Sequence, residues 1–458
     1  MTRRRTSVGG TVVVAADVVV TADPERRVLT PGWVRIDRGM TTEIGGGRPP
    51  VGTQLLRGDI VMPGLVSAHQ HLVDVLVRGG PPAASFLEWL LGTYHAGLAH
   101  ARPEDCYAAI ATVRAATLAA GITTVVDAWS VGPVDDPRRV EGCAVASLTA
   151  HRRSGGRTLF APMFVEQVPA GWGSVDGFDP ARLCRPYAES LALVEELATA
   201  HADQLLTIAP APELPETSTP EGLRATRALA AALGTVVPIH TCASPESRAV
   251  CGPQELAEVG LLGPQLLAAH CNAVEPQDIG CLGTAGIGVV HCPSASRALG
   301  ATQQTPLAAL RAAGVSGALG LDNASLHAGV DLFAEAREAA LVARSQGAIW
   351  TGDDLVALLT SEAARAIGMG DRVGSLEVGK RGDLLLLDAS RPHWWPRGDR
   401  WVDTIVRCAR ADDVTAVLVE GSVVAHDGLA VRHGEPHRLD AAARRIRALR
   451  WDDAVHVV

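Results

Sequence analysis

His69 and His71 are the residues of this chain whose types and spacing fit metal binding best. They are separated by one residue at the end of an apolar segment that begins at Pro63. Side chains alternate along an extended backbone, so both imidazoles would leave such a strand on the same side. Two imidazoles are half of a common zinc site. A His-x-His pair alone is more often a packing feature than a ligand pair, so its meaning depends on what the other strand ends carry.

Apolar runs of strand length recur through the middle of the chain. Together with the run before His69 they make eight, the others being 121–126, 158–165, 205–209, 235–239, 266–269, 286–290 and 315–321. Helical stretches separate most of them. Thr219, Pro220 and Gly234 provide the cap, first-turn proline and terminal glycine of one such helix. The pattern predicts an α/β fold with a (β/α)₈ TIM-type barrel over residues 62–370.

The two ends of the chain have a different pattern. Residues 1–61 and 371–458 contain short β-rich segments split by glycine and proline. We expect them to pair into one small composite β-sandwich beside the barrel, with one part from each terminus. The length of 458 residues suits a large barrel with a smaller appended domain.

Polar residues stand at the carboxyl ends of the predicted barrel strands, where such barrels carry their chemistry. They supply imidazoles and carboxylates to one mouth: His69, His71, Asp127, Glu166, His240, His270, His291 and Asp322. The alternative is that these histidines are hydrogen-bonded within the protein and bind no metal. The number of imidazoles together with Asp322 favours a site for a divalent metal.

These residues lie within motifs that resemble the amidohydrolase superfamily, in particular the branch of cytosine, guanine and S-adenosylhomocysteine deaminases and triazine hydrolases. The resemblance covers nearly the whole chain. The motifs occur in the family's order, at residues 62–65 before His69-Gln70-His71, 121–127, 269–271, 291–294, 319–322, 374–383 and 391–393. Each motif alone is modest, but all of them together in the right order are a specific signal.

The resemblance implies a ligand set and a mechanism. It assigns one metal, most often Zn²⁺ with Fe²⁺ as the alternative, to His69, His71, His240 and Asp322. His270 would hydrogen-bond the metal-bound water. The chemistry agrees, because a metal lowers the pKa of bound water toward about 7. Asp322 could take the water's proton and pass it to the leaving nitrogen, which makes Asp322 and His270 the expected catalytic residues.

Lys380 decides between subtypes of the superfamily. Binuclear members bridge two metals with a carboxylated lysine at a barrel strand end. Lys380 is the only lysine in the chain and belongs to the C-terminal β-rich segment. A lysine-bridged pair of metals is therefore excluded, and we expect one metal ion.

Position 243 departs from the deaminase pattern. That branch places a proton-shuttling glutamate three residues after the histidine of strand five, where this chain has Ala243. Loss of a general acid–base group typically costs about 10²–10⁴ in rate. Glu246, Glu166, Cys242 or His291 could compensate, or the substrate could need no ring protonation. Alternatively, the enzyme opens a cyclic amide or imine, or displaces a leaving group such as halide.

Several further residues are expected near the substrate. Trp89 lies in the long segment after strand one, which covers the substrate in the family, whereas His95 and His100 of that segment are expected to face solvent. Arg297 could meet an anionic or carbonyl-rich substrate. The expected substrate-binding set is thus Trp89, Glu166, Glu246, His291 and Arg297. Cys242, Cys271 and Cys292 are expected to be small buried residues of the barrel wall rather than ligands.

Composition narrows the class of function. The net charge of −9 argues against a nucleic-acid partner, and no apolar run reaches the length of a membrane span. Nine cysteines without Cys-x-x-Cys pairs fit a reduced cytoplasmic compartment. The prediction is a metal-dependent hydrolase of a non-peptide C–N bond in a small, heterocyclic molecule, with deamination as the leading reaction. A catalytically weak metal-binding homologue is the minor alternative. The family resemblance suggests a homodimer or larger homo-oligomer.

Overall fold

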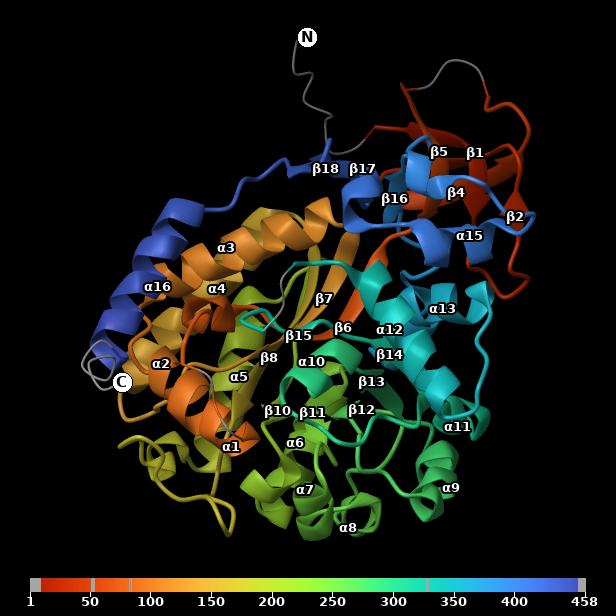
Figure 1. The fold of residues 1–458 in the computed structure, drawn as a ribbon. Coiled ribbons are helices and arrows are strands. Elements are labelled where there is room, and N and C mark those ends of the chain that lie inside the picture. Colours follow the sequence, from red (N-terminus) through yellow and green to blue (C-terminus); the bar gives the residue numbers. More distant parts are fainter. Residues whose placement is uncertain (1–9, 51–53, 82, 84, 327–328, 452–458) are drawn as a thin grey trace.

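Strands from both ends of the chain pair in one sheet of the computed structural model, which describes residues 10–50, 54–81, 83, 85–326 and 329–451. This nine-stranded sheet comprises β1 (Val12–Val20), β2 (Val28–Leu29), β3 (Gly32–Asp37), β4 (Met40–Gly46), β5 (Gln54–Pro63), β16 (Leu384–Leu387), β17 (Val414–Val419), β18 (Ser422–His426) and β19 (Leu429–Ala430). The N-terminal and C-terminal parts join where β5 and β16 pair antiparallel, with Pro63 opposite Leu384. In Figure 1 the sheet lies at one end of the molecule. The expected pairing of the two termini is confirmed.

The middle of the chain forms two parallel sheets, and all of their strands except β10 and β15 lie at the predicted apolar runs. One sheet contains β6 (Leu65–His71), β7 (Ile122–Trp129), β8 (Arg157–Phe164), β9 (Leu206–Ile208), β10 (Ala211–Pro212) and β15 (Asp322–Asn323). The other contains β11 (Val237–Thr241), β12 (Leu266–His270), β13 (Gly288–His291) and β14 (Ser316–Leu319). Their interior is packed mainly with alanine, valine and leucine side chains.

A two-residue link between β14 and β15 connects the two parallel sheets. β14 and β15 are separated only by Gly320 and Leu321, and β15 then pairs with β6. Gly320 is required here, because a Cβ at this position would lie 2.6 Å from the carbonyl oxygen of His69. The tight passage brings Asp322 beside the histidines at the end of β6.

Helices cover the parallel strands on the outside (Figure 1). The longer ones are α3 (Pro103–Ala119), α4 (Pro137–Ser154), α5 (Tyr187–His201), α6 (Pro220–Leu233), α9 (Pro276–Ala285), α12 (Leu332–Ser345) and α13 (Gly352–Leu359). The Thr219 side chain accepts a hydrogen bond from Gly222 N at the start of α6, and Gly234 ends that helix with a φ of 64°. The helix predicted from these residues is confirmed. No helix among the described residues is both long and apolar enough to cross a membrane.

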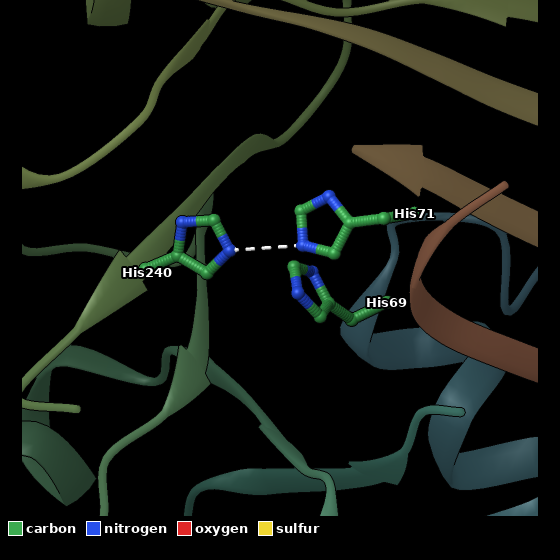
Figure 2. Close-up of side chains that lie close together, drawn as sticks. All are labelled: His69, His71 and His240. Carbon is green, nitrogen blue, oxygen red and sulfur yellow. Dashed lines mark hydrogen bonds between the residues drawn. The ribbon is translucent and has the colours of Figure 1, made fainter. Parts of the chain in front are cut away.

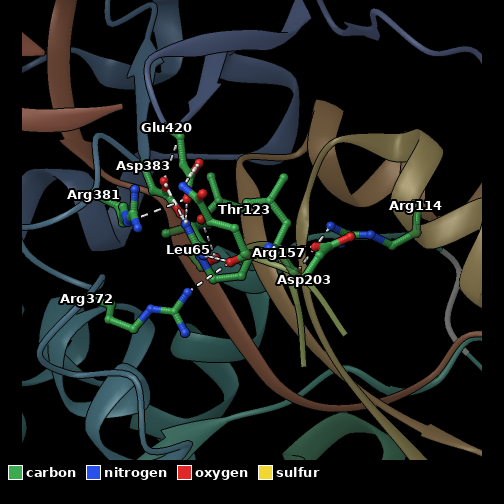
Figure 3. Close-up of polar contacts among 11 residues, drawn as sticks. Leu65, Arg114, Thr123, Arg157, Asp203, Arg372, Arg381, Asp383 and Glu420 are labelled. Carbon is green, nitrogen blue, oxygen red and sulfur yellow. Dashed lines mark hydrogen bonds and ion pairs between the residues drawn. The ribbon is translucent and has the colours of Figure 1, made fainter. Parts of the chain in front are cut away.

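A buried ion pair joins the first parallel sheet to the sheet of the termini. Arg157 of β8 donates to Asp383 through Nε at 3.1 Å and through Nη2 at 3.0 Å, and both side chains are almost fully buried. The Arg157 guanidinium also pairs with Glu420 at 3.2 Å (Figure 3). The two charges satisfy each other in a low-dielectric environment and fix the sheets in one relative position.

The C-terminal segment is not entirely β-structure. After β19 the chain forms α16 (Pro436–Arg450), which packs on α3, away from the sheet of the termini (Figure 1). Arg445 of α16 pairs with Asp105 at the start of α3, and Arg447 donates to the carbonyl oxygen of Arg78 at 3.1 Å. The expectation that 371–458 belongs to the β-sandwich therefore does not describe this last helix.

Candidate metal centre and active site

Three imidazoles meet at the carboxyl ends of β6 and β11. His69 and His71 come from β6 and His240 from β11, and Figure 2 shows their rings turned toward one another. The Nε2 atoms of His71 and His240 lie 3.2 Å apart. The strand alternation that places His69 and His71 on one side is the reason both reach the centre.

Asp322 and His270 complete the cluster. One carboxylate oxygen of Asp322, Oδ1, lies 3.5 Å from His69 Nε2 and 3.4 Å from His71 Nε2. The other, Oδ2, lies 3.9 Å from Nε2 of His270. The five side chains therefore converge on one small volume from β6, β11, β12 and β15.

Backbone carbonyls orient two of the imidazoles. Nδ1 of His71 is hydrogen-bonded to the carbonyl oxygen of Ala128 and Nδ1 of His240 to that of Glu213, each at 2.6 Å. A carbonyl only accepts, so both Nδ1 atoms carry the proton and both Nε2 atoms present a lone pair to the centre. This arrangement is typical of metal-ligating histidines.

The donor set fits a divalent cation. Candidate ligand atoms of His69, His71 and His240 lie within 4.8 Å of one another, as do those of His69, His270 and Asp322. His69 Nε2 and Asp322 Oδ2 are buried, and no described residue hydrogen-bonds them. Burial lowers the pKa of His69 and His71 well below the usual value, and that of His270 to about 3. Neutral imidazoles around one carboxylate are the ligands that Zn²⁺ and Fe²⁺ accept.

The backbone is strained at the same strand ends. His270, Cys271 and Asp322 have φ values of 73°, 54° and 60°, and Cys242 after His240 has 47°. Non-glycine residues rarely adopt this left-handed region, and such residues gather at functional sites. The strain turns the His270 and Asp322 side chains toward the centre.

A cavity opens directly beside the cluster. His71, His240, His270 and Asp322 form its floor, and its wall includes Phe86, Trp89, Leu90, Tyr94, Met163, Glu213, Leu214, Ala243, Leu299 and Asn323. The wall is mostly apolar with a few polar groups, as small-molecule sites usually are. Trp89, predicted near the substrate, lies on this wall.

The other residues predicted to contact substrate lie elsewhere. Glu166 accepts hydrogen bonds from the backbone N–H and hydroxyl of Thr219 and so caps α6. Glu246 is exposed in the first turn of α7 (Pro245–Val250), and Arg297 forms an exposed ion pair with Glu338 at 2.8 Å. None of the three lines the cavity at the cluster.

His291 and the three cysteines are buried. Burial lowers the pKa of His291 to about 3, and no described residue hydrogen-bonds either ring nitrogen. His291 does not line the cavity. Cys242, Cys271 and Cys292 are fully buried, as expected, and burial raises the pKa of each thiol. Protonated thiols are poor metal ligands.

The sequence did not point to two residues that line the cavity, Glu213 and Tyr94, and it misplaced the nearby His95. Glu213 follows β10 and is buried, and its Oε1 lies 3.1 Å from Nε2 of His95. His95 was expected to face solvent, which is wrong, because it is fully buried at the end of the π-helix Trp89–His95. Tyr94 packs edge-on against the ring of His71.

Comparison with known proteins identifies a family and several relatives. The amidohydrolase family profile matches residues 60–424. A 5-methylthioadenosine/S-adenosylhomocysteine deaminase of Symbiobacterium thermophilum is 33% identical over 391 residues, covering 81% of this chain and 82% of the relative. One of Moorella thermoacetica is 30% identical over 445 residues, covering 90% and 93%.

Solved structures give the same result. An adenosine deaminase of Xanthomonas campestris with bound zinc superposes with a TM-score of 0.80 at 25% identity, covering 96% of this chain and 98% of the neighbour. An atrazine chlorohydrolase of Arthrobacter aurescens, complexed with zinc, superposes with a TM-score of 0.82 at 20% identity over 95% of this chain and all of the neighbour (100%). The latter likeness concerns the fold alone.

The fold and the histidine–aspartate cluster thus define a hydrolase with an amidohydrolase-type site, acting on C–N bonds other than peptide bonds. The chain belongs to the amidohydrolase family.

Proposed function

We propose that the protein is a hydrolytic deaminase of a small aminated heterocycle and that one divalent metal ion serves the reaction. The observation that carries this proposal is the convergence of His69, His71, His240, His270 and Asp322 beside a mostly apolar cavity. The deaminase names of the similar proteins support an adenosine-like substrate. The expected ligands are His69, His71, His240 and Asp322, with Zn²⁺ as the ion and Fe²⁺ as the alternative.

The side chains divide the chemistry among them. A bound divalent ion supplies Lewis acidity, which lowers the pKa of a water molecule toward about 7. Asp322, whose Oδ2 faces His270, takes a proton from the attacking water and passes it to the leaving nitrogen. His270 hydrogen-bonds the water and fixes its direction of attack. The apolar wall around Trp89 and Leu90 excludes other water molecules from the reacting carbon.

A second reaction, displacement of another leaving group or opening of a cyclic amide or imine, is favoured by Ala243. Ala243 lines the cavity with a methyl group at the position where deaminases of this branch carry a glutamate. A substrate that needs no ring protonation would not require that carboxylate. Among the described residues Glu246 lies outside the cavity and does not replace it.

The remaining expectations belong to the proposal. We propose that β6 to β15 form one (β/α)₈ barrel within residues 62–370. The passage from β14 to β15 supports its closure. The sheet of the termini would be the small sandwich domain, built from 1–61 and 371–458. Nine free cysteines support a reducing, cytoplasmic location. The predictions of a homo-oligomer and of no nucleic-acid or membrane partner stay predictions.

Metal content and ammonia release test the proposal together. Protein purified with zinc should hold about one equivalent and release ammonia from adenosine-like nucleosides, aminopterins or aminotriazines. Asp322→Asn should abolish turnover. Bound metal without turnover of any aminated heterocycle would contradict deamination and lead to tests of cyclic amides, imines and halogenated triazines.

A further inference from the structure

Glu213 is a buried carboxylate in the wall of the active-site cavity. It is 3% exposed, lies directly after β10 and lines the cavity together with His71, His240 and Asp322. A carboxylate in such a place is costly unless something pairs with it. The position is therefore one where a carboxylate needs a structural or functional reason.

His95 supplies one partner and leaves room for another. Its Nε2 lies 3.1 Å from Glu213 Oε1, and this contact fixes the side chain. No described residue hydrogen-bonds Oε2. Glu213 therefore keeps one carboxylate oxygen available in a largely apolar wall.

Tyr94 is a second, independent sign that the wall is made for a polar ligand. Its side chain lines the same cavity and is 2% exposed, and among the described residues nothing hydrogen-bonds its hydroxyl. A phenol hydroxyl can donate a hydrogen bond to such a ligand. A buried hydroxyl without a partner is costly unless a ligand satisfies it.

Glu213 also borders a second cavity. That cavity continues from Met163, Glu213 and His95 toward Leu183 and Arg185 of the segment before α5. Met163 and Glu213 line both cavities. A substrate whose reacting carbon lies at the metal ligands would direct its remaining part along Glu213.

We propose that Glu213, positioned by His95, is the specificity-determining residue of this site and binds an O–H or N–H donor on the part of the substrate that lies away from the metal ligands. Tyr94 donates a complementary hydrogen bond to an acceptor on the same substrate. This inference rests on the proposed function, because it takes the substrate to be a small heterocycle. It implies that compounds lacking such a donor bind poorly.

The test uses matched pairs of compounds with zinc-loaded wild-type protein and E213Q. Adenosine is compared with 2′,3′,5′-trideoxyadenosine, which has no hydroxyl, and adenine with 9-methyladenine, so that the pairs separate hydroxyl from ring N–H donors. We expect E213Q to raise the KM of the donor-bearing compound by about 10- to 100-fold, the effect of removing a charge-assisted hydrogen bond. The kcat should change far less, and the KM of the donor-free compound should stay close to wild type.

Two further variants separate recognition from structure. E216Q changes a glutamate three residues away that does not line the cavity, and its KM and metal content should match wild type. H95Q should raise KM in the same donor-dependent way, which a general loss of packing would not do. Equal KM ratios for wild type and E213Q across both pairs would overturn the inference.

Failure of the proposed function would give a different result. If the wild type turns over neither pair, deamination of these purines is contradicted, and binding of the same four compounds is then measured by calorimetry. Donor-dependent weakening of binding by E213Q would still support the role of Glu213. Equal affinity of wild type and E213Q for all four, or no binding of any of them, would overturn it.

Discussion

The imidazole of His240 donates its Nδ1 proton to the backbone carbonyl of Glu213 at 2.6 Å. The same residue therefore orients a candidate metal ligand through its backbone and faces the cavity with its side chain. Metal binding and substrate recognition are coupled through one short segment after β10. A substitution that changes only the side chain at 213 should leave the orientation of His240 intact.

Removal of the metal should destabilise the fold. The ligands come from β6, β11 and β15, which a bound ion links together. An ion at a free concentration of about 1,000 times its Kd adds about 4 kcal/mol to stability. We expect a chelator to lower the Tm by several degrees and zinc to restore it, measured by calorimetry. H71A, which lacks one expected ligand, is the matching control, and its Tm should be the same with and without zinc. A wild-type Tm that does not change when the metal is removed would contradict the claim that the metal stabilises the fold.

Asp322→Asn should separate catalysis from folding. An amide cannot take the proton of the attacking water, so turnover should fall below detection, a loss of at least about 10²–10⁴ in kcat. Far-ultraviolet circular dichroism should match wild type, because Asn is nearly isosteric. E216Q serves as the control with wild-type turnover. Retention of full activity by D322N would remove Asp322 from the mechanism.

The buried ion pair between Arg157 and Asp383 should contribute strongly to the stability of the contact between the sheet of the termini and the parallel strands. Breaking one partner of a buried pair typically costs about 3–5 kcal/mol, since a charge stays buried and uncompensated. D383N should therefore lower the free energy of unfolding by about that amount in urea denaturation, although Glu420 retains part of the pairing with Arg157. R157M combined with D383L should recover stability.

An exposed ion pair provides the comparison. Arg182 and Asp135 lie 2.7 Å apart, with about half of each side chain exposed. D135N should change the free energy of unfolding by at most about 1 kcal/mol. Equal effects of D383N and D135N would contradict the assignment of a structural role to the buried pair.

His151 should make the protein sensitive to mild acid. Burial lowers its pKa, despite the hydrogen bond of its Nε2 to Asp127 at 2.8 Å. The unfolded chain binds a proton below the ordinary pKa of about 6.5, whereas the folded chain does not. Stability therefore rises with pH up to about 6.5 and is lost as the pH falls below it.

The variant H151Q keeps a donor for Asp127 and removes the titration. Denaturation between pH 5 and pH 7 should give a shallower pH dependence for H151Q than for wild type. H437Q changes an exposed histidine and should keep the wild-type slope. The same slope in H151Q and wild type would contradict the assignment.

The strands and the ligand cluster could be predicted because they depend on local patterns. Apolar runs mark β6 to β14, and a strand's alternation places His69 and His71 together. Strand ends in parallel sheets meet at one edge, so the polar strand-end residues could be placed at one mouth, and the family resemblance then singled out His240, His270 and Asp322.

Glu213 and His95 could not be placed in the same way. The fourth strand is split into β9 and β10, and its end was set at Ala209, four residues before Glu213. Their contact joins residues 118 apart in sequence. The packing of α16 on α3 likewise depends on tertiary contacts, and the arginine-rich sequence of α16 does not predict which element it packs against.

The most direct test of the central claim is mass spectrometry of the product formed by zinc-loaded protein in ¹⁸O-labelled water. Wild type should replace the amino group of an aminated heterocycle by a hydroxyl that carries one ¹⁸O, with one ammonia released, and D322N should form no product. A product that has gained whole water and kept its nitrogen would contradict deamination. It would show that the cluster of histidines around Asp322 catalyses ring opening instead.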